Sequence, residues 1–430
     1  MGNVKKIFVR EESISDDNYS QLINHDDDYK GREQGGSNLN AFMSCVCVVA
    51  GAGTLGIPYA IQQGGWITII FLILAAVMAT YANIKLIECL YYDGNRRRTS
   101  MSELAYDAFG RSGSAIVGFL FNCISVGCPI LYLILIGDNL QMIFSKIDFG
   151  MKNWIYLVAS IMCIPYILLK TMKDVKLLSL FGVLTVVLMV FVVMIMSIID
   201  YPNNKDNPHD IIVMRKLPIS LATVSFSYGG NIVYPYVEES MRKPRNWPKV
   251  VSFVMFTITI LYLIIGFFGY FTYGNNAKSP IYLNLPDGIL VKAVIILITL
   301  HVTFALPIYQ TVFSLELENY YSINENKLGK LREFIYRTLL RLVTVIAEVY
   351  IAVSIPFFAD IMSLLGALAN GSLVVVIPLL LWLKLVGWSK LENNNWEKVW
   401  IIFTLIFSIT IATIGSYDAV VSLYNDIKNQ

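Results

Sequence analysis

The chain has 430 residues, of which 56% are hydrophobic and 15% are charged, and its formal net charge at pH 7 is +2. Soluble domains carry about 25% charged residues, so this composition excludes a soluble enzyme or binding domain. It indicates an integral membrane protein in a lipid bilayer, for which we expect no nucleic-acid partner.

The first 36 residues are polar and carry an acidic cluster at residues 26–28. A segment with so few large apolar groups cannot bury enough surface to fold alone. We therefore expect residues 1–36 to form a disordered cytoplasmic tail and residues 37–430 to form a transmembrane domain.

Apolar stretches follow one another along the rest of the chain. A helix needs about 20 apolar residues to cross a bilayer, and the stretches of roughly this length fall near 39–62, 66–91, 113–141, 154–170, 177–200, 217–237, 248–273, 289–315, 335–357, 360–384 and 396–424. The pattern predicts an all-α integral membrane protein with 11 transmembrane helices.

Lys and Arg gather in alternate loops between these stretches, for example at residues 96–98 and 242–249. Such residues accumulate in cytoplasmic loops. The bias predicts a cytoplasmic N-terminus and, with eleven spans, a luminal or extracellular C-terminus.

Two spans are interrupted by glycine-rich turns followed by proline, the first break at residues 51–58 and the second break at residues 227–235. Free backbone groups inside a bilayer are tolerated only where they face protein or a water-filled cavity. The breaks open corresponding halves, 39–200 and 217–384, with 396–424 as an extra span. Short or interrupted spans in matching halves are typical of secondary transporters built from inverted repeats.

The first break has the chemistry of an anion site. Glycines let backbone amides approach an anion, and the helix that resumes after the break presents its positive dipole end. The G-x-G-x-x-G spacing lacks the strand and βαβ unit that dinucleotide binding requires. We expect a carboxylate cradle formed by Gly51, Ala52, Gly53, Thr54, Leu55 and Gly56.

The second break offers hydrogen-bond acceptors for an ammonium group, both from unwound carbonyls and from polar side chains. Its candidate residues are Ser225, Ser227, Tyr228, Gly229 and Asn231. A carboxylate site facing an amine site describes an α-amino acid substrate. The alternative interpretation is that both breaks are small-residue helix contacts or proline kinks.

Four motifs stand out: residues 51–60 with Gly64-Gly65-Trp66, Met241 to Pro244, Asn284 to Pro286 and Ser363 to Ala367. Together they resemble the amino acid/auxin permease family, most closely its fungal vacuolar amino acid transporter branch. The resemblance implies the leucine-transporter fold, with a 5+5 inverted repeat, discontinuous spans 1 and 6, and one extra helix. It also implies amino acid transport, at a vacuolar or other endomembrane or at the plasma membrane.

The resemblance bears on individual residues as well. In that fold a tyrosine of the third span can contact the substrate carboxylate, which makes Tyr132 a candidate. Sodium-coupled members carry an asparagine four residues before the first motif glycine, where this chain has Cys47, a poor ligand for a hard cation. This departure favours protons over sodium as the coupling ion. The amino acid would then move either with protons, by symport, or against them, by antiport.

Ionisable residues inside a bilayer are costly and indicate function. His301 and Glu348 lie near the middle of their spans and are candidates for ion coupling, each with the alternative of a structural hydrogen bond. Thr299 and Thr303 share one helix face that His301 cannot share. We expect Arg337 and Arg341 to reach the membrane interface from a span end.

Other classes of membrane protein find less support. An enzyme needs converging catalytic side chains, and the chain has only three histidines. A channel would show repeated polar rings. We expect no catalytic residue, metal or cofactor, and a sensor that binds amino acids without transporting them remains the alternative, as does sodium coupling.

Overall fold

The computed structural model describes residues 32, 35–94, 96–168, 176–355, 358–391 and 394–429. Over these ranges the chain is helical, and its one β-type pairing is an isolated parallel bridge between Gly36 and Met241. The expected cytoplasmic tail, residues 1–36, lies outside the described residues except for Arg32, Gly35 and Gly36.

The first half of the chain folds into helices that match its predicted spans. They are α3 (Asn38–Val49), α4 (Gly53–Gly64), α5 (Thr68–Leu90), α6 (Met101–Ile143), α7 (Met151–Leu168) and α8 (Lys176–Asn204). The side chain of Ser37 accepts a hydrogen bond from the Asn40 amide and so caps α3. In α6, Gly110 has φ 68°, which divides a short leading helix from the long apolar one.

The second half contains α9 (Leu217–Ser227), α10 (Tyr234–Ser240), α11 (Trp247–Tyr273), α12 (Ile289–Tyr320), α13 (Glu325–Leu328), α14 (Lys330–Ser354), α15 (Phe358–Leu364), α16 (Ile377–Leu385) and α17 (Asn395–Asn429). Two π-helical segments, Leu365–Asn370 and Ser372–Val376, connect α15 to α16. Such π-helical turns often mark functional sites.

In the described residues, eight helices are long and apolar enough to cross a membrane, or nine if α3 and α4 count as one span. The two predicted spans that this count omits are 217–237, where α9 is short and ends at the second break, and 335–357, where α14 carries buried charges. The protein is therefore a multi-pass membrane protein.

Both predicted breaks interrupt helices. The axes of α3 and α4 differ by 51°, and α9 gives way at Tyr228 to a short 3₁₀ turn, Asn231–Val233, before α10. Gly230 has φ 146°, a conformation that an L side chain rarely adopts. The helix is thus interrupted at both positions that the glycine and proline pattern predicts.

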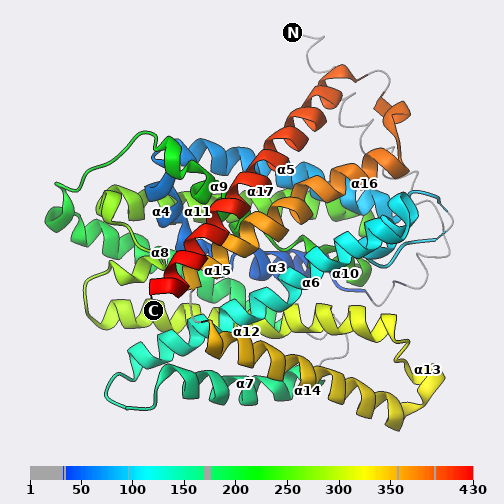
Figure 1. Cartoon of the computed structure of the whole chain (residues 1–430), viewed down its shortest axis with the longest axis horizontal. Helices are drawn as coiled ribbons and strands as arrows, with labels where there is room; N and C mark the ends of the chain where they lie inside the picture. The colour runs from blue at the N-terminus through cyan, green and yellow to red at the C-terminus, as the bar shows by residue number, and fades with distance from the viewer. Residues whose placement is uncertain are drawn as a thin grey trace.

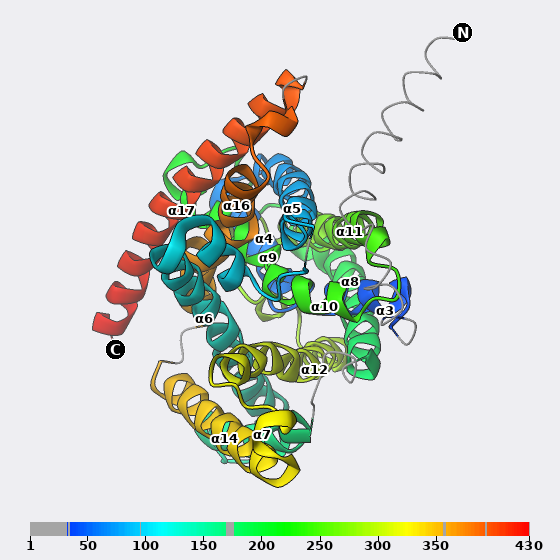
Figure 2. The same cartoon turned by 90° about the vertical axis from the view of Figure 1, so that its right-hand side faces the viewer.

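The helices form layers around the interrupted pair. Helix α12 packs against α6 and α8, while α4 packs against α9. In both views α7 and α14 lie beyond α12 as an outer layer, and α17 runs diagonally across the face that Figure 1 turns to the viewer (Figures 1 and 2). This arrangement gives α12 one side toward the breaks and another toward α7 and α14.

Candidate functional site

The two interrupted helices touch at Gly53 and Ser227. A Cβ atom on Gly53 would lie 2.7 Å from the Ser227 Cα, closer than real atoms pack. The Ser227 hydroxyl donates toward the carbonyls of Thr223 at 2.8 Å and Gly53 at 3.2 Å. Glycine at position 53 therefore allows the backbones of the two breaks to meet.

Tyr262 of α11 links the two breaks. Its hydroxyl lies 2.9 Å from the carbonyl oxygen of Val49 and 2.5 Å from that of Ser227. One hydroxyl hydrogen cannot fully satisfy two acceptors. The pair of carbonyls therefore keeps capacity to accept a hydrogen bond from a bound ammonium.

Two further tyrosines flank the first break. The Tyr309 hydroxyl of α12 donates to the Val48 carbonyl at 3.2 Å, and its ring meets that of Tyr132 edge to face. The Tyr132 hydroxyl lies 2.5 Å from where a Cβ of Gly51 would be. We call residues 51–56, 227 and 229–231, with these three tyrosines, the break junction.

The amides of Gly51 and Ala52 donate to no acceptor in the described part of the chain. They precede α4, a helix of twelve residues that begins at Gly53. Thr54, Leu55 and Gly56 are buried in its first turns. Free amides at a helix N-terminus suit a carboxylate, so the junction offers donors on one break and acceptors on the other.

The tenth predicted span also contacts the second break. Asn231 donates to the Leu373 carbonyl at 2.5 Å, and Asn370 donates to the Phe226 carbonyl at 3.2 Å. A Cβ on Gly229 would lie 2.0 Å from the Asn370 amide nitrogen. The π-helical segments therefore hold the second break in place through two asparagines.

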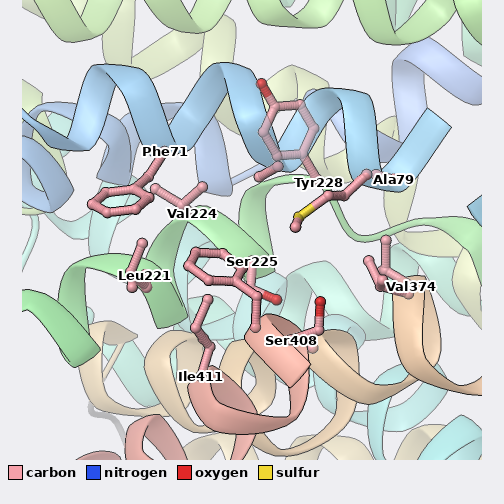
Figure 3. A pocket seen from close by; sticks show the side chains of 14 residues that line it. Phe71, Ala79, Leu221, Val224, Ser225, Tyr228, Val374, Ser408 and Ile411 are labelled. Atoms are coloured by element: carbon pink, nitrogen blue, oxygen red, sulfur yellow. The ribbon is translucent and has the colours of Figure 1, made fainter. Parts of the chain in front are cut away.

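Two of the expected site residues face a different space. Ser225 and Tyr228 line a cleft of about 50 Å³ between α5, α9, the π-helical segments and α17, together with Ser408 (Figure 3). The Tyr228 hydroxyl hydrogen-bonds Thr259 at 3.0 Å. The lining is mostly apolar, so this cleft does not show the paired donors and acceptors of the break junction.

Cys47 and His301 lie near one another. His301 Nδ1 is 2.7 Å from the Gly182 carbonyl of α8, and a Cβ on Gly182 would lie 2.4 Å from the Cys47 sulfur. His301 Nε2 is buried and has no hydrogen-bond partner in the described residues. Cys47, Gly182 and His301 therefore form one cluster beside α3.

Thr299 and Thr303 do not join that cluster. Thr299 accepts a hydrogen bond from Asn139 of α6 at 2.9 Å, whereas Thr303 donates to the Thr299 carbonyl of its own helix. Thr299 and His301 thus point to different helices, as their spacing predicts. Glu348 lies farther out, on α14, where it accepts a hydrogen bond from Gln310 at 2.6 Å.

A charged cluster closes the far end of the second interrupted helix. The buried Glu238 carboxylate of α10 accepts from Arg32 at 3.1 Å, Tyr91 at 2.6 Å and Arg97 at 2.8 Å. Burial lowers the pKa of Arg97 most strongly, but Glu238, Tyr91 and Glu239 together outweigh burial and raise that pKa above its ordinary value. Glu238 therefore ties α10 to the tail and to the loop after α5.

Several residues at the junction were not predicted from the sequence. Tyr262 and Tyr309 are two of 25 tyrosines, and only the rotation of their helices brings them to the breaks. Asn370 and Gln310 offered a weak signal, because each is an uncharged amide within an apolar span.

The described fold and the break junction define a class, that of membrane transporters with interrupted helices. Three solved transporter structures share the fold: MhsT in complex with L-phenylalanine (TM-score 0.58, 12% identity, 90% of this chain and 100% of that one), a Na⁺-coupled sialic acid symporter (TM-score 0.56, 13% identity, 94% and 93%) and Mhp1, a nucleobase-cation-symport-1 family transporter (TM-score 0.53, 12% identity, 92% and 94%). At these identities the likeness concerns the fold alone.

The family follows from the sequence comparison. The profile described as "Transmembrane amino acid transporter protein" matches residues 34–421, and the chain belongs to this family, which consists of transporters and not enzymes. Two Arabidopsis thaliana relatives are amino acid transporter AVT1J, 28% identical over 87% of this chain and 89% of the relative, and amino acid transporter ANT1, 27% identical over 90% and 93%. The resemblance inferred from the motifs is confirmed.

Proposed function

We propose that the protein is a secondary active transporter that carries amino acids across a membrane by alternating access, coupled to protons. The observation that supports this most is the Tyr262 hydroxyl, which contacts a carbonyl of each interrupted helix. The names of the relatives, all amino acid transporters, agree with the chemistry of the junction.

In this proposal the substrate carboxylate binds the free amides of the first break, beside Tyr132, and its ammonium binds carbonyls and hydroxyls of the second. Gly51 to Gly56 supply the first site, with Ser227, Gly229 and Asn231 in the second. Ser225 and Tyr228 would take part only if the second break turned. Such a site binds a zwitterion without a charged side chain, because backbone dipoles match both of its ends.

The proposed topology has eleven spans in two inverted five-helix repeats plus a final helix, with a cytoplasmic N-terminus and a C-terminus in an organelle lumen or outside the cell. Alternating access then requires α10 to separate from Arg32 and Arg97 whenever the cytoplasmic side opens. The ion pairs of Glu238 would thus stabilise the state with that side closed.

Protons are the proposed coupling ion because Cys47 stands where a hard cation would need an oxygen ligand. The candidates that would carry or respond to the proton are Cys47, His301, Thr299, Thr303 and Glu348. Among them Glu348 is a buried carboxylate with a single described hydrogen-bond donor.

Purified protein in proteoliposomes tests the proposal. We expect labelled amino acids to accumulate when a pH gradient is imposed and not when a sodium gradient replaces it. Binding without uptake would identify a sensor, and accumulation driven by sodium alone would contradict proton coupling. A protein with Gly53→Val, which should clash with Ser227, provides the inactive control.

A further inference from the structure

Helix α14 carries a row of polar and charged side chains that point into the protein. The row consists of Glu333, Arg337, Arg341, Thr344 and Glu348, and each is at least nine-tenths buried. Their spacing of three or four residues places them on one helix face. The opposite face exposes large apolar residues such as Leu339 and Val343 to the bilayer. The expectation that Arg341 reaches the interface is wrong, because it is fully buried.

Two residues of this row, Arg341 and Glu348, meet polar partners on α12 or α7. Glu333 and Arg337 instead form an ion pair within α14, and Thr344 donates to the Leu340 carbonyl of its own helix. Arg341 donates to the Glu318 carboxylate of α12 at 3.0 Å and to the Tyr166 carbonyl of α7 at 2.5 Å. One turn further along α12, the Ser314 hydroxyl hydrogen-bonds the Tyr166 hydroxyl. We call this set, from Glu318 and Arg341 through Tyr166 and Ser314 to Gln310 and Glu348, the polar stripe.

The stripe ends at an incompletely satisfied carboxylate. Gln310 donates to Glu348 Oε2, but Glu348 Oε1, Gln310 Oε1 and Thr311 Oγ1 are buried and have no hydrogen-bond partner in the described residues. Buried polar atoms normally have partners. The unused oxygens of Glu348 and of Gln310, which contacts it, provide acceptors that a transferred proton, or a water carrying it, requires.

The end of the stripe lies next to the break junction along the chain. Gln310 follows Tyr309, whose hydroxyl bonds the Val48 carbonyl of the first break. A change in charge at Glu348 would alter its hydrogen bond to Gln310. This would displace the turn of α12 that supports the first break. The carboxyl group is thus connected to the proposed substrate site through α12 without lining it.

We propose that the polar stripe conducts protons to Glu348, which is the proton-binding group of the transporter; this inference rests on the proposed function above. In the transfer, the Tyr166 and Ser314 hydroxyls each accept one proton and release another, Glu348 Oε1 gains one, and Arg341 stays protonated and orients Glu318. Successive levels on α12 are four residues apart, about 6 Å along the axis, a distance that one water can bridge. In the proposed orientation, the opposite end of the stripe opens toward the cytoplasm.

Few titratable or charged groups among the described residues lie near Glu348. Tyr166 of α7 lies within electrostatic reach, Glu318 belongs to α12, and Arg341 is two turns away on α14. Helix α6 also packs on α14 and brings the titratable residues Cys123, Cys128, Tyr132 and Asp138, none of which has a described contact with Glu348. His301 bonds Gly182 of α8 instead.

The test separates amino acid exchange from proton movement in proteoliposomes that contain a pH-sensitive dye. Exchange of labelled for unlabelled amino acid needs no net proton flux, so Glu348→Gln should keep exchange within about threefold of wild type. It should lower amino-acid-driven proton flux by about tenfold or more. Glu348→Asp retains a carboxyl group and should restore proton flux with a shifted pH profile.

The relay is tested by removing single hydroxyls. Tyr166→Phe and Ser314→Ala should each slow proton flux several-fold, and the double variant should be no slower than either, because both remove the same bridge. Ser416→Ala, whose hydroxyl bonds only its own helix at Ala412, and Glu239→Gln, at an exposed carboxylate, are matched controls and should behave as wild type.

The outcomes distinguish the two proposals. If wild-type protein exchanges amino acids and accumulates them with a pH gradient, but Glu348→Gln keeps full proton flux, the proton path is wrong and the proposed function stands. If only His301→Gln loses proton flux, the proton path through Glu348 is likewise wrong, and His301 is the proton-binding group instead. If wild-type protein exchanges no amino acid, the proposed function fails, and this inference with it.

Discussion

The break junction and the polar stripe lie on opposite sides of α12 and differ in chemistry. The junction uses free backbone groups, tyrosine hydroxyls and the Asn231 amide, without a charged side chain among its defined residues. The stripe includes the carboxylates of Glu318 and Glu348 and the Arg341 guanidinium group. A zwitterionic substrate brings its own charges and needs only dipoles, whereas a proton needs a group that can titrate. The two regions are thus suited to different ligands.

The comparison also shows how the regions communicate. Tyr309 and Gln310 are neighbours in sequence, and one supports the first break while the other holds Glu348. A helix transmits a displacement of one residue to the next because its backbone is rigid. Substitutions that change substrate binding without changing proton coupling, or the reverse, therefore test whether the two regions have these separate roles.

The largest effect should follow from filling the contact between the two breaks. Gly53→Val places side-chain atoms against the Ser227 backbone, where a Cβ already lies at 2.7 Å, so transport should fall by about a hundredfold or more. Uptake and size-exclusion behaviour should be measured together. Gly118→Ala, where the nearest atom is at 3.8 Å, is the control and should transport normally.

Tyr262→Phe should have the next largest effect. It removes the hydroxyl shared by the Val49 and Ser227 carbonyls, so the apparent affinity for substrate should fall by about tenfold, with the proton dependence unchanged. Concentration-dependent exchange measures this. Tyr350→Phe, at a tyrosine exposed on α14, should leave affinity unaltered; an equal loss there would argue against a specific role for Tyr262.

Glu238→Gln should weaken the closed state. The amide cannot balance Arg32 and Arg97, so the melting temperature should fall by a few degrees and the cytoplasmic side should open more often. Labelling of a cysteine introduced near α10 would report the opening. Glu239→Gln, beside it but exposed, is the matched control, and similar labelling of both variants would contradict the closing role.

The smallest effect is expected for Ser225→Ala. Because Ser225 lines the cleft with α17 and not the break junction, substrate affinity should change by less than about twofold. Ser227→Ala, two residues away, should weaken binding more. The reverse order would move the amine site from the junction into the cleft.

Much of the site could be predicted because glycine and proline act locally. Their pattern at residues 51–58 and 227–235 predicts the interruptions without reference to any other helix. The approach of Tyr132 to the first break was also expected, from the resemblance. The interruptions depend on short segments whose conformation the sequence determines directly, whereas the position of Tyr132 depends on the fold that the resemblance implies.

The remainder depends on how helices rotate against one another. Tyr262 reaches both breaks only because α11 presents that face, and a period of 3.6 residues does not choose among the faces of an apolar helix. Arg341 illustrates the same limit: near a span end it was expected at the interface, but Glu318 on α12 binds it inside. The π-helical segments that carry Asn370 have no signal in composition.

The central claim is that substrate and protons are handled in separate regions that α12 connects. The most direct test measures amino acid exchange and amino-acid-driven proton flux in the same proteoliposomes for Tyr262→Phe and Glu348→Gln. We predict that Tyr262→Phe lowers substrate affinity and keeps the number of protons moved per amino acid, whereas Glu348→Gln keeps exchange and loses proton flux. Loss of both activities to the same extent in both variants, with each protein folded, would contradict it.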